Sequence, residues 1–177
     1  IVALILVSVD DYAIATNNAD WYVSFIKRYS ARYEITDLGQ LDLYSGIHIT
    51  YIESGIFLSQ QREIQDLLIR FDMTECNPSR TPMETTFDTS AVDQENVSPP
   101  FAYPSLIGAL LWIARMTRPD ILFAVIALSS FNKNFTPRHV IAIKRVLRYL
   151  KGTIKYALFY PSAQFTSFSL AIPFSIF

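Results

Sequence analysis

Apolar and polar positions alternate in short runs through the first sixty residues, a pattern that predicts strands. Two apolar runs, residues 1–9 and 12–16, flank Asp10 and Asp11, as expected for a hairpin with acidic residues at its tip. Further extended segments are predicted at 33–36, 44–52 and 56–59. This part of the chain is therefore expected to form a strand hairpin and a small antiparallel sheet with helices.

Helical spacing, with apolar residues at i, i+3, i+4 and i+7, occurs twice in the first half and dominates the second. In the first half it covers residues 19–32, behind an Asn-Asn pair that can cap a helix, and residues 64–71. Beyond residue 103 it predicts helices over 105–116, 118–131 and 136–151. Proline-rich, polar residues between 77 and 100 are typical of a linker or surface loop. The predicted fold class is α+β, with a strand-rich lobe followed by an all-helical lobe.

Charge divides the chain in a similar way. The net charge is −1, but residues 1–100 hold 15 acids and 6 bases, whereas residues 101–177 hold 1 acid and 9 bases. A basic lobe of this kind favours an anionic partner. The single Cys76 excludes an internal disulfide and favours an intracellular setting. Because no apolar run reaches the ~20 residues that a membrane helix needs, we expect no membrane partner.

Asp10 and Asp11 are the first candidates for chemistry. Adjacent carboxylates repel each other unless solvent or a cation relieves the repulsion. The pair is therefore either a solvated turn or a site for a hard cation such as Mg²⁺, held by rigid flanking strands. Nucleotidyl transfer uses paired metal ions because they stabilise both the attacking and the leaving oxygen.

Several motifs give this pair a context. Asp10-Asp11 in its hairpin is similar to the catalytic aspartate pair of reverse transcriptases, and the segments downstream resemble the copia-type retrotransposon polyprotein. These segments are DLGQLDLYSGIHI from Asp37, GIFLSQQREIQDLLIRFDM from Gly55, NPSRTPM from Asn77, YPSLIGALLWIARMTRPDILFAV from Tyr103 and LRYLKGT from Leu147. The resemblance covers residues 2–160 and follows the family's order throughout.

The resemblance implies RNA-directed DNA polymerisation in the intact parent, by two-metal nucleotidyl transfer. Asp10 and Asp11 would be catalytic residues and ligands of Mg²⁺ or Mn²⁺. The segment Leu43, Tyr44, Ser45 and Gly46 resembles the primer-grip region and would position the primer end. The implied partners are an RNA template and an RNA–DNA or DNA duplex, in a cytoplasmic particle or the nucleus.

A basic stripe begins in the helix predicted after Thr136. Its members are spaced i, i+4, i+7 and i+11, beside an apolar face, and are Lys144, Arg148, Lys151 and Lys155. One interpretation is a solvated amphipathic helix. The other is contact with the phosphates of a template–primer duplex, which needs no sequence readout. Structural roles are expected for Arg118 and His139, and an exposed sheet position for His48.

In the family's terms, residues 1–59 would be the end of a polymerase palm with the Asp-Asp hairpin. Residues 60–76 would be a thumb-like helix, 77–102 a linker, 103–160 a helical connection lobe and 161–177 an aberrant tail. The first catalytic aspartate and the fingers would lie upstream, and a ribonuclease H portion downstream. Because this chain lacks them, we expect it to be inactive as a polymerase.

Departures from the family pattern leave two alternatives open. Ser8 stands where the family usually has tyrosine, Tyr44-Ser45 replaces Phe-Leu, and Val140 stands where tryptophan is common. The alternatives are a non-catalytic remnant that acts as a nucleic-acid-binding or protein-interaction module, and an unselected pseudogene product.

Overall fold

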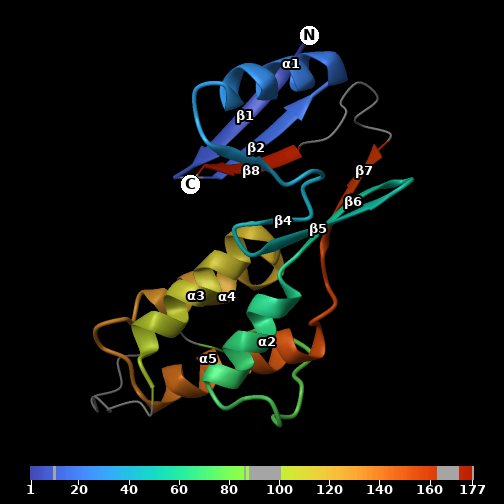
Figure 1. The fold of residues 1–177 in the computed structure, drawn as a ribbon. Helices are drawn as coiled ribbons and strands as arrows, with labels where there is room; N and C mark the ends of the chain where they lie inside the picture. Colours follow the sequence, from blue (N-terminus) through green and yellow to red (C-terminus); the bar gives the residue numbers. More distant parts are fainter. Residues whose placement is uncertain (10, 86, 88–100, 163–171, 177) are drawn as a thin grey trace. The chain divides into compact units, whose positions relative to one another are not determined.

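The structure, a computed structural model, describes residues 1–9, 11–85, 87, 101–162 and 172–176 (Figure 1). It divides into two compact units. The strand unit comprises Ile1–Phe57 and Phe159–Phe177, and the helical unit comprises Leu58–Leu158. The predicted α+β class is confirmed. No helix in the described part of the chain is long and apolar enough to cross a membrane.

The first sheet of the strand unit begins with the predicted hairpin. β1 (Ala3–Ser8) pairs antiparallel with β2 (Asp11–Thr16), with Ser8 opposite Asp11. β8 (Ile172–Ile176) pairs antiparallel with β2 and with β3 (Ile35–Asp37), so that the strand order is β1-β2-β8-β3. Most of β1 is exposed at the edge of this sheet.

The position of β8 goes beyond the sequence-based expectation, since an aberrant tail would not be expected to pair with a sheet. Its backbone groups bond to neighbours on both sides, one of them more than 150 residues earlier in the chain. Such distant pairing leaves no periodic signal in a short apolar segment. The origin of residues 161–177 stays a prediction.

Helix α1 (Ala19–Ser30) covers the predicted segment and begins at the predicted cap. The side chain of Asn18 accepts a hydrogen bond of 2.7 Å from the Trp21 amide, which satisfies one of the unpaired donors at the helix N-terminus. Tyr22 on α1 packs against Ile14 of β2, which is 1% exposed. Burial of these side chains fixes the helix on the hairpin sheet.

The second sheet has the order β4-β5-β6-β7. Its strands are β4 (Leu43–Tyr44), β5 (Ile47–Ile52), β6 (Gly55–Ser59) and β7 (Leu158–Pro161). Gly55 adopts φ 152°, and a Cβ atom there would collide with the backbone of Tyr160 and Pro161. Only glycine allows the two strands to approach so closely at this point.

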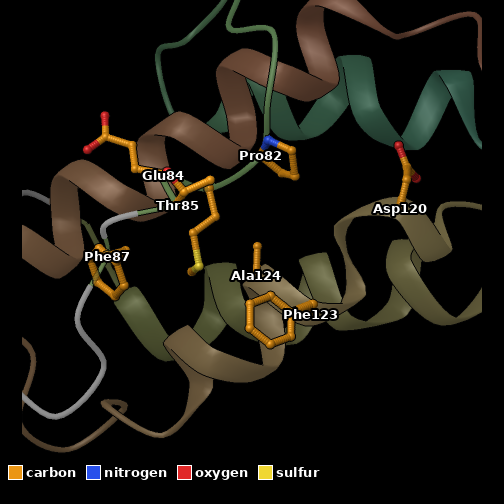
Figure 2. A pocket seen from close by; sticks show the side chains of 8 residues that line it. Pro82, Glu84, Thr85, Phe87, Asp120, Phe123 and Ala124 are labelled. Atoms are coloured by element: carbon orange, nitrogen blue, oxygen red, sulfur yellow. The ribbon is translucent and has the colours of Figure 1, made fainter.

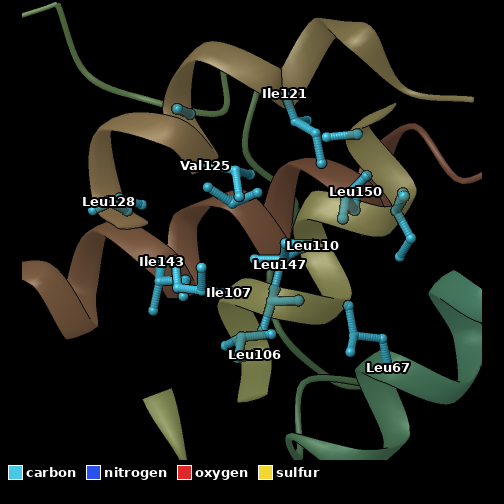
Figure 3. Packing of buried hydrophobic residues seen from close by; sticks show 14 of the residues in the cluster. Leu67, Leu106, Ile107, Leu110, Ile121, Val125, Leu128, Ile143, Leu147 and Leu150 are labelled. Atoms are coloured by element: carbon cyan, nitrogen blue, oxygen red, sulfur yellow. The ribbon is translucent and has the colours of Figure 1, made fainter. Parts of the chain in front are cut away.

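The helical unit has one core that includes every helix after β6. Its elements are α2 (Gln61–Arg70), α3 (Tyr103–Met116), the 3-10 helix η1 (Pro119–Ile121), α4 (Leu122–Ser129) and α5 (Pro137–Gly152). Leu67, Leu110, Val125 and Leu147 converge from four of them (Figure 3). The helix predicted within 60–76 therefore packs in the same unit as the helices predicted within 103–160.

Candidate functional site

The acidic hairpin tip is described in part. Asp11 begins β2 and is exposed, and Asp10 lies outside the described residues. Val9, which leads into the tip, has φ 54°, a left-handed conformation typical of a tight turn. No group of three His, Cys, Asp or Glu side chains that could hold a metal occurs among the residues described. These residues do not form a complete metal site, and no catalytic step follows from them.

The candidate primer-positioning segment forms the turn between β4 and β5. Tyr44 lies opposite Ile47, and Leu43 lies opposite the half-buried His48. Ser45 and Gly46 connect the strands with φ 49° and 78°, the two positive values that characterise a type I′ hairpin turn. Residues 43–46 are therefore strand β4 and the two-residue turn that follows it, with a defined register.

This hairpin and strand β2 share a small core in the strand unit. Buried Leu41 and Ala13 form its centre, and Tyr44 and Ile49 pack against it. The Tyr51 hydroxyl donates to the Leu41 carbonyl at 2.6 Å. Because Ala13 follows the acidic tip by two residues, this core connects the strand that begins with Asp11 to the base of the 43–46 turn.

Helix α5 holds most of the basic stripe. Its sixteen residues include five Arg and Lys side chains and no acid. Thr136 caps the helix: its amide donates to Nδ1 of the buried His139 at 3.0 Å, and the His139 ring stacks on Phe131. The structural role expected for His139 is confirmed.

Two members of the stripe hold the segment that follows α2. Nε of Arg148 donates to the Asn77 carbonyl at 2.6 Å, and Nζ of Lys151 donates to the Cys76 carbonyl at 2.8 Å. We call residues 76–85 the strap. The other two members differ: the Lys144 ammonium lies 5.9 Å from the centre of the Phe101 ring, and Lys155 is exposed beyond the end of α5.

Arg145 is a basic residue of α5 that the predicted stripe does not include. It donates to the Thr81 carbonyl at 3.2 Å, to Thr81 Oγ1 at 3.0 Å and to Glu84 at 2.7 Å. The Ser79 amide adds a bond to the Arg148 carbonyl. The predicted linker thus begins with a strap that is bonded along the basic face of α5.

Arg118 has the structural role expected for it. Its side chain is buried and donates to both carboxylate oxygens of Asp120, at 3.0 and 2.8 Å. It also donates to the backbone carbonyl and the hydroxyl of Thr153, just after α5. Burial raises the pKa of Asp120, but hydrogen bonds from Arg118 and Tyr149 outweigh it and leave this pKa below the ordinary value.

A recess of about 370 Å³ lies between the end of the strap and the beginning of α4 (Figure 2). Its lining residues are Pro82, Met83, Glu84, Thr85, Phe87, Asp120, Phe123 and Ala124. Both acids in this lining are bound by arginines, Glu84 by Arg145 and Asp120 by Arg118. The described lining is therefore mainly apolar, and its carboxylates already have cationic partners.

Known proteins match most of the chain. The family described as reverse transcriptase (RNA-dependent DNA polymerase) matches residues 2–85. The Retrovirus-related Pol polyprotein from transposon RE1 of Arabidopsis thaliana is 35% identical over 158 residues, which cover 89% of this chain and 11% of the polyprotein. The corresponding polyprotein from transposon TNT 1-94 of Nicotiana tabacum is 30% identical over 158 residues, with 85% and 12% covered. No solved structure matches the chain.

A shorter relative is similar to this chain over an alignment of comparable length. An uncharacterized mitochondrial protein of Arabidopsis thaliana is 32% identical over 155 residues, which cover 88% of this chain and 64% of that protein. The chain thus spans 11–12% of the two Pol polyproteins and less than two thirds of the mitochondrial protein. The likeness to the polyproteins extends past residue 85 into the helical unit. The resemblance noted in the sequence is confirmed: the chain is similar to a fragment of the reverse transcriptase of copia-type retrotransposons.

Proposed function

We propose that this chain is a duplex-holding part of a copia-type reverse transcriptase, and that it does not polymerise DNA by itself. The observation that carries the proposal is α5, a helix with five cations and no acid. Asp120, the one acid among residues 101–177, is bound by the buried Arg118. A basic surface of this kind attracts nucleic-acid phosphates whatever the base sequence.

In the intact parent, the strand unit would contribute to RNA-directed DNA synthesis. Asp10 and Asp11 would be ligands of Mg²⁺ or Mn²⁺, and residues 43–46 would position the primer end. The small core around Leu41 supports the second assignment, because it gives the 43–46 turn a fixed base beside strand β2. The same proposal includes two partners, an RNA template and its duplex with DNA. It also includes a location in a cytoplasmic particle or the nucleus.

The test is binding of the full chain to an RNA–DNA duplex and a DNA duplex at several salt concentrations. Two paired variants divide the stripe: Lys144→Gln with Lys155→Gln leaves the hydrogen bonds to the strap intact, and Arg148→Gln with Lys151→Gln removes two of them. Each pair should weaken binding by a similar factor for every base sequence. On B-form DNA the log–log salt slope should fall by about 0.9 for each phosphate that the variant no longer neutralises.

Thermal melting of both variants separates binding from folding. The Lys144/Lys155 pair should melt like the wild type, so its weaker binding reports the missing phosphate interactions alone. Unchanged affinity and slope in both variants would mean that α5 is a solvated face. Absence of salt-dependent binding by the wild type would contradict the duplex-holding function, and primer extension with Mg²⁺ or Mn²⁺ would contradict the expected inactivity.

A further inference from the structure

The strap runs in the direction opposite to α5, and several of its residues accept hydrogen bonds from basic side chains of this helix. Cys76 and Asn77 accept from Lys151 and Arg148, and Thr81 and Glu84 accept from Arg145. Lower-numbered strap residues thus lie at the C-terminal end of the helix. The strap therefore occupies part of the face to which the proposed function assigns phosphate binding.

The acceptors on this face differ in charge. Arg148 and Lys151 donate to neutral backbone carbonyls, so these hydrogen bonds leave their positive charges uncompensated. Arg145 donates to the Glu84 carboxylate. Among the described cations of α5, Arg145 is the one that forms a salt bridge. Glu84 is thus the strap residue that neutralises a charge on this face.

Arg145 uses different guanidinium nitrogens for its two partners, Thr81 and Glu84. Nε and one terminal nitrogen of the guanidinium hold Thr81, and the other terminal nitrogen donates to Glu84. Removal of the Glu84 carboxylate would therefore leave the guanidinium oriented by Thr81, with one nitrogen able to donate elsewhere. A guanidinium nitrogen can donate to a phosphate oxygen as well as to a carboxylate oxygen.

We propose that Glu84 competes with nucleic-acid phosphate for Arg145, so that the strap partly masks the duplex-binding face of the same chain. This inference rests on the proposed function. The side chains of Arg145 and Glu84 are 28% and 60% exposed. An ion pair so accessible to water is weak, and phosphate can displace it readily. Arg145 then becomes a phosphate-binding residue already placed by the strap.

The test uses duplex binding by the full chain with Glu84→Gln, Arg145→Gln and the double variant. Asp66→Asn on α2 is the matched control, because it makes the same change in net charge at an exposed position. Glu84→Gln should raise affinity about two- to fivefold, the range that an exposed ion pair is worth. On DNA, its salt slope should steepen by up to about 0.9. The gain should disappear in the Arg145→Gln background, as required of coupled residues.

Each result has a separate meaning. If Glu84→Gln gains no more than Asp66→Asn, or gains equally in the Arg145→Gln background, the masking proposal is overturned while duplex binding stands. If the wild type shows no salt-dependent binding, the proposed function fails and the masking proposal fails with it. If Arg145→Gln does not fold, the comparison of Glu84→Gln with Asp66→Asn decides alone.

Discussion

Asp120 holds the buried guanidinium of Arg118, which lies between α3 and η1. Because its pKa is below the ordinary value of 3.8, its ionised form stabilises the fold at pH values above that figure. This contribution is lost as the pH falls through the lowered pKa of the folded state. Asp120→Asn should lower the free energy of unfolding at pH 7 by about 2–3 kcal/mol. This is less than for a fully buried pair, because the Asp120 side chain is 33% exposed.

Urea denaturation of the wild type and Asp120→Asn between pH 7 and pH 3 gives the measurement. The difference between the two proteins should be constant near neutrality. It should narrow below about pH 4, because Asp120 then takes up a proton in the unfolded wild type at a higher pH than in the folded wild type. Asp66→Asn, at an exposed site, should show little difference at any pH. A constant gap down to pH 3 would mean that Asp120 acts through packing and not through its charge.

Residue roles could be predicted where the partner is close in sequence. Asn18 caps α1 by bonding an amide three residues away, and His139 bonds Thr136 over the same separation. Arg145 shows the limit, because Glu84 is 61 residues away and no spacing in the helix indicates it. The stripe predicted from helical periodicity therefore omits the residue that holds both Thr81 and Glu84.

At the scale of elements, the approach of β6 to β7 depends on Gly55. Gly55→Ala introduces a Cβ that collides with the backbone of the neighbouring strand and also strains a positive φ. Gly39→Ala is the matched control, because Gly39 has φ 79° but open space around its Cβ position. By urea denaturation Gly39→Ala should cost about 1 kcal/mol and Gly55→Ala about 2–4 kcal/mol. Equal costs would show that the strands move apart easily.

Helices are easier to predict than sheet pairing, because helical contacts join residues close in sequence and strand partners can be far apart in sequence. Periodicity placed α1, α2, α3 and α5 closely, since helical contacts are local. It predicts the pairing of β1 with β2 across the acidic turn, but it gives no partners for β7 and β8, which pair with segments far earlier in the chain. The α+β class was predictable, whereas the packing of α2 with the later helices was not.

For the whole molecule, truncation after residue 162 tests the importance of β8. Removing β8 leaves β2 and β3 without the strand between them, so their amides should lose protection in hydrogen exchange. The helical unit, with its own core, should keep its protection and serve as the internal control. Unchanged protection in β2 and β3 would show that residues 163–177 are dispensable.

The division of the chain also sets an order of events during synthesis. The helical unit is one continuous segment, so all of its buried core residues are synthesised before β7 and β8. The strand unit contains two separate segments of the chain, Ile1–Phe57 and Phe159–Phe177. The whole of Leu58–Leu158 is synthesised between them, before β8 can pair with β2 and β3. Domains generally fold as units in the order of their completion. The core of the helical unit should therefore be able to form while the exposed hairpin still lacks its partner strand β8.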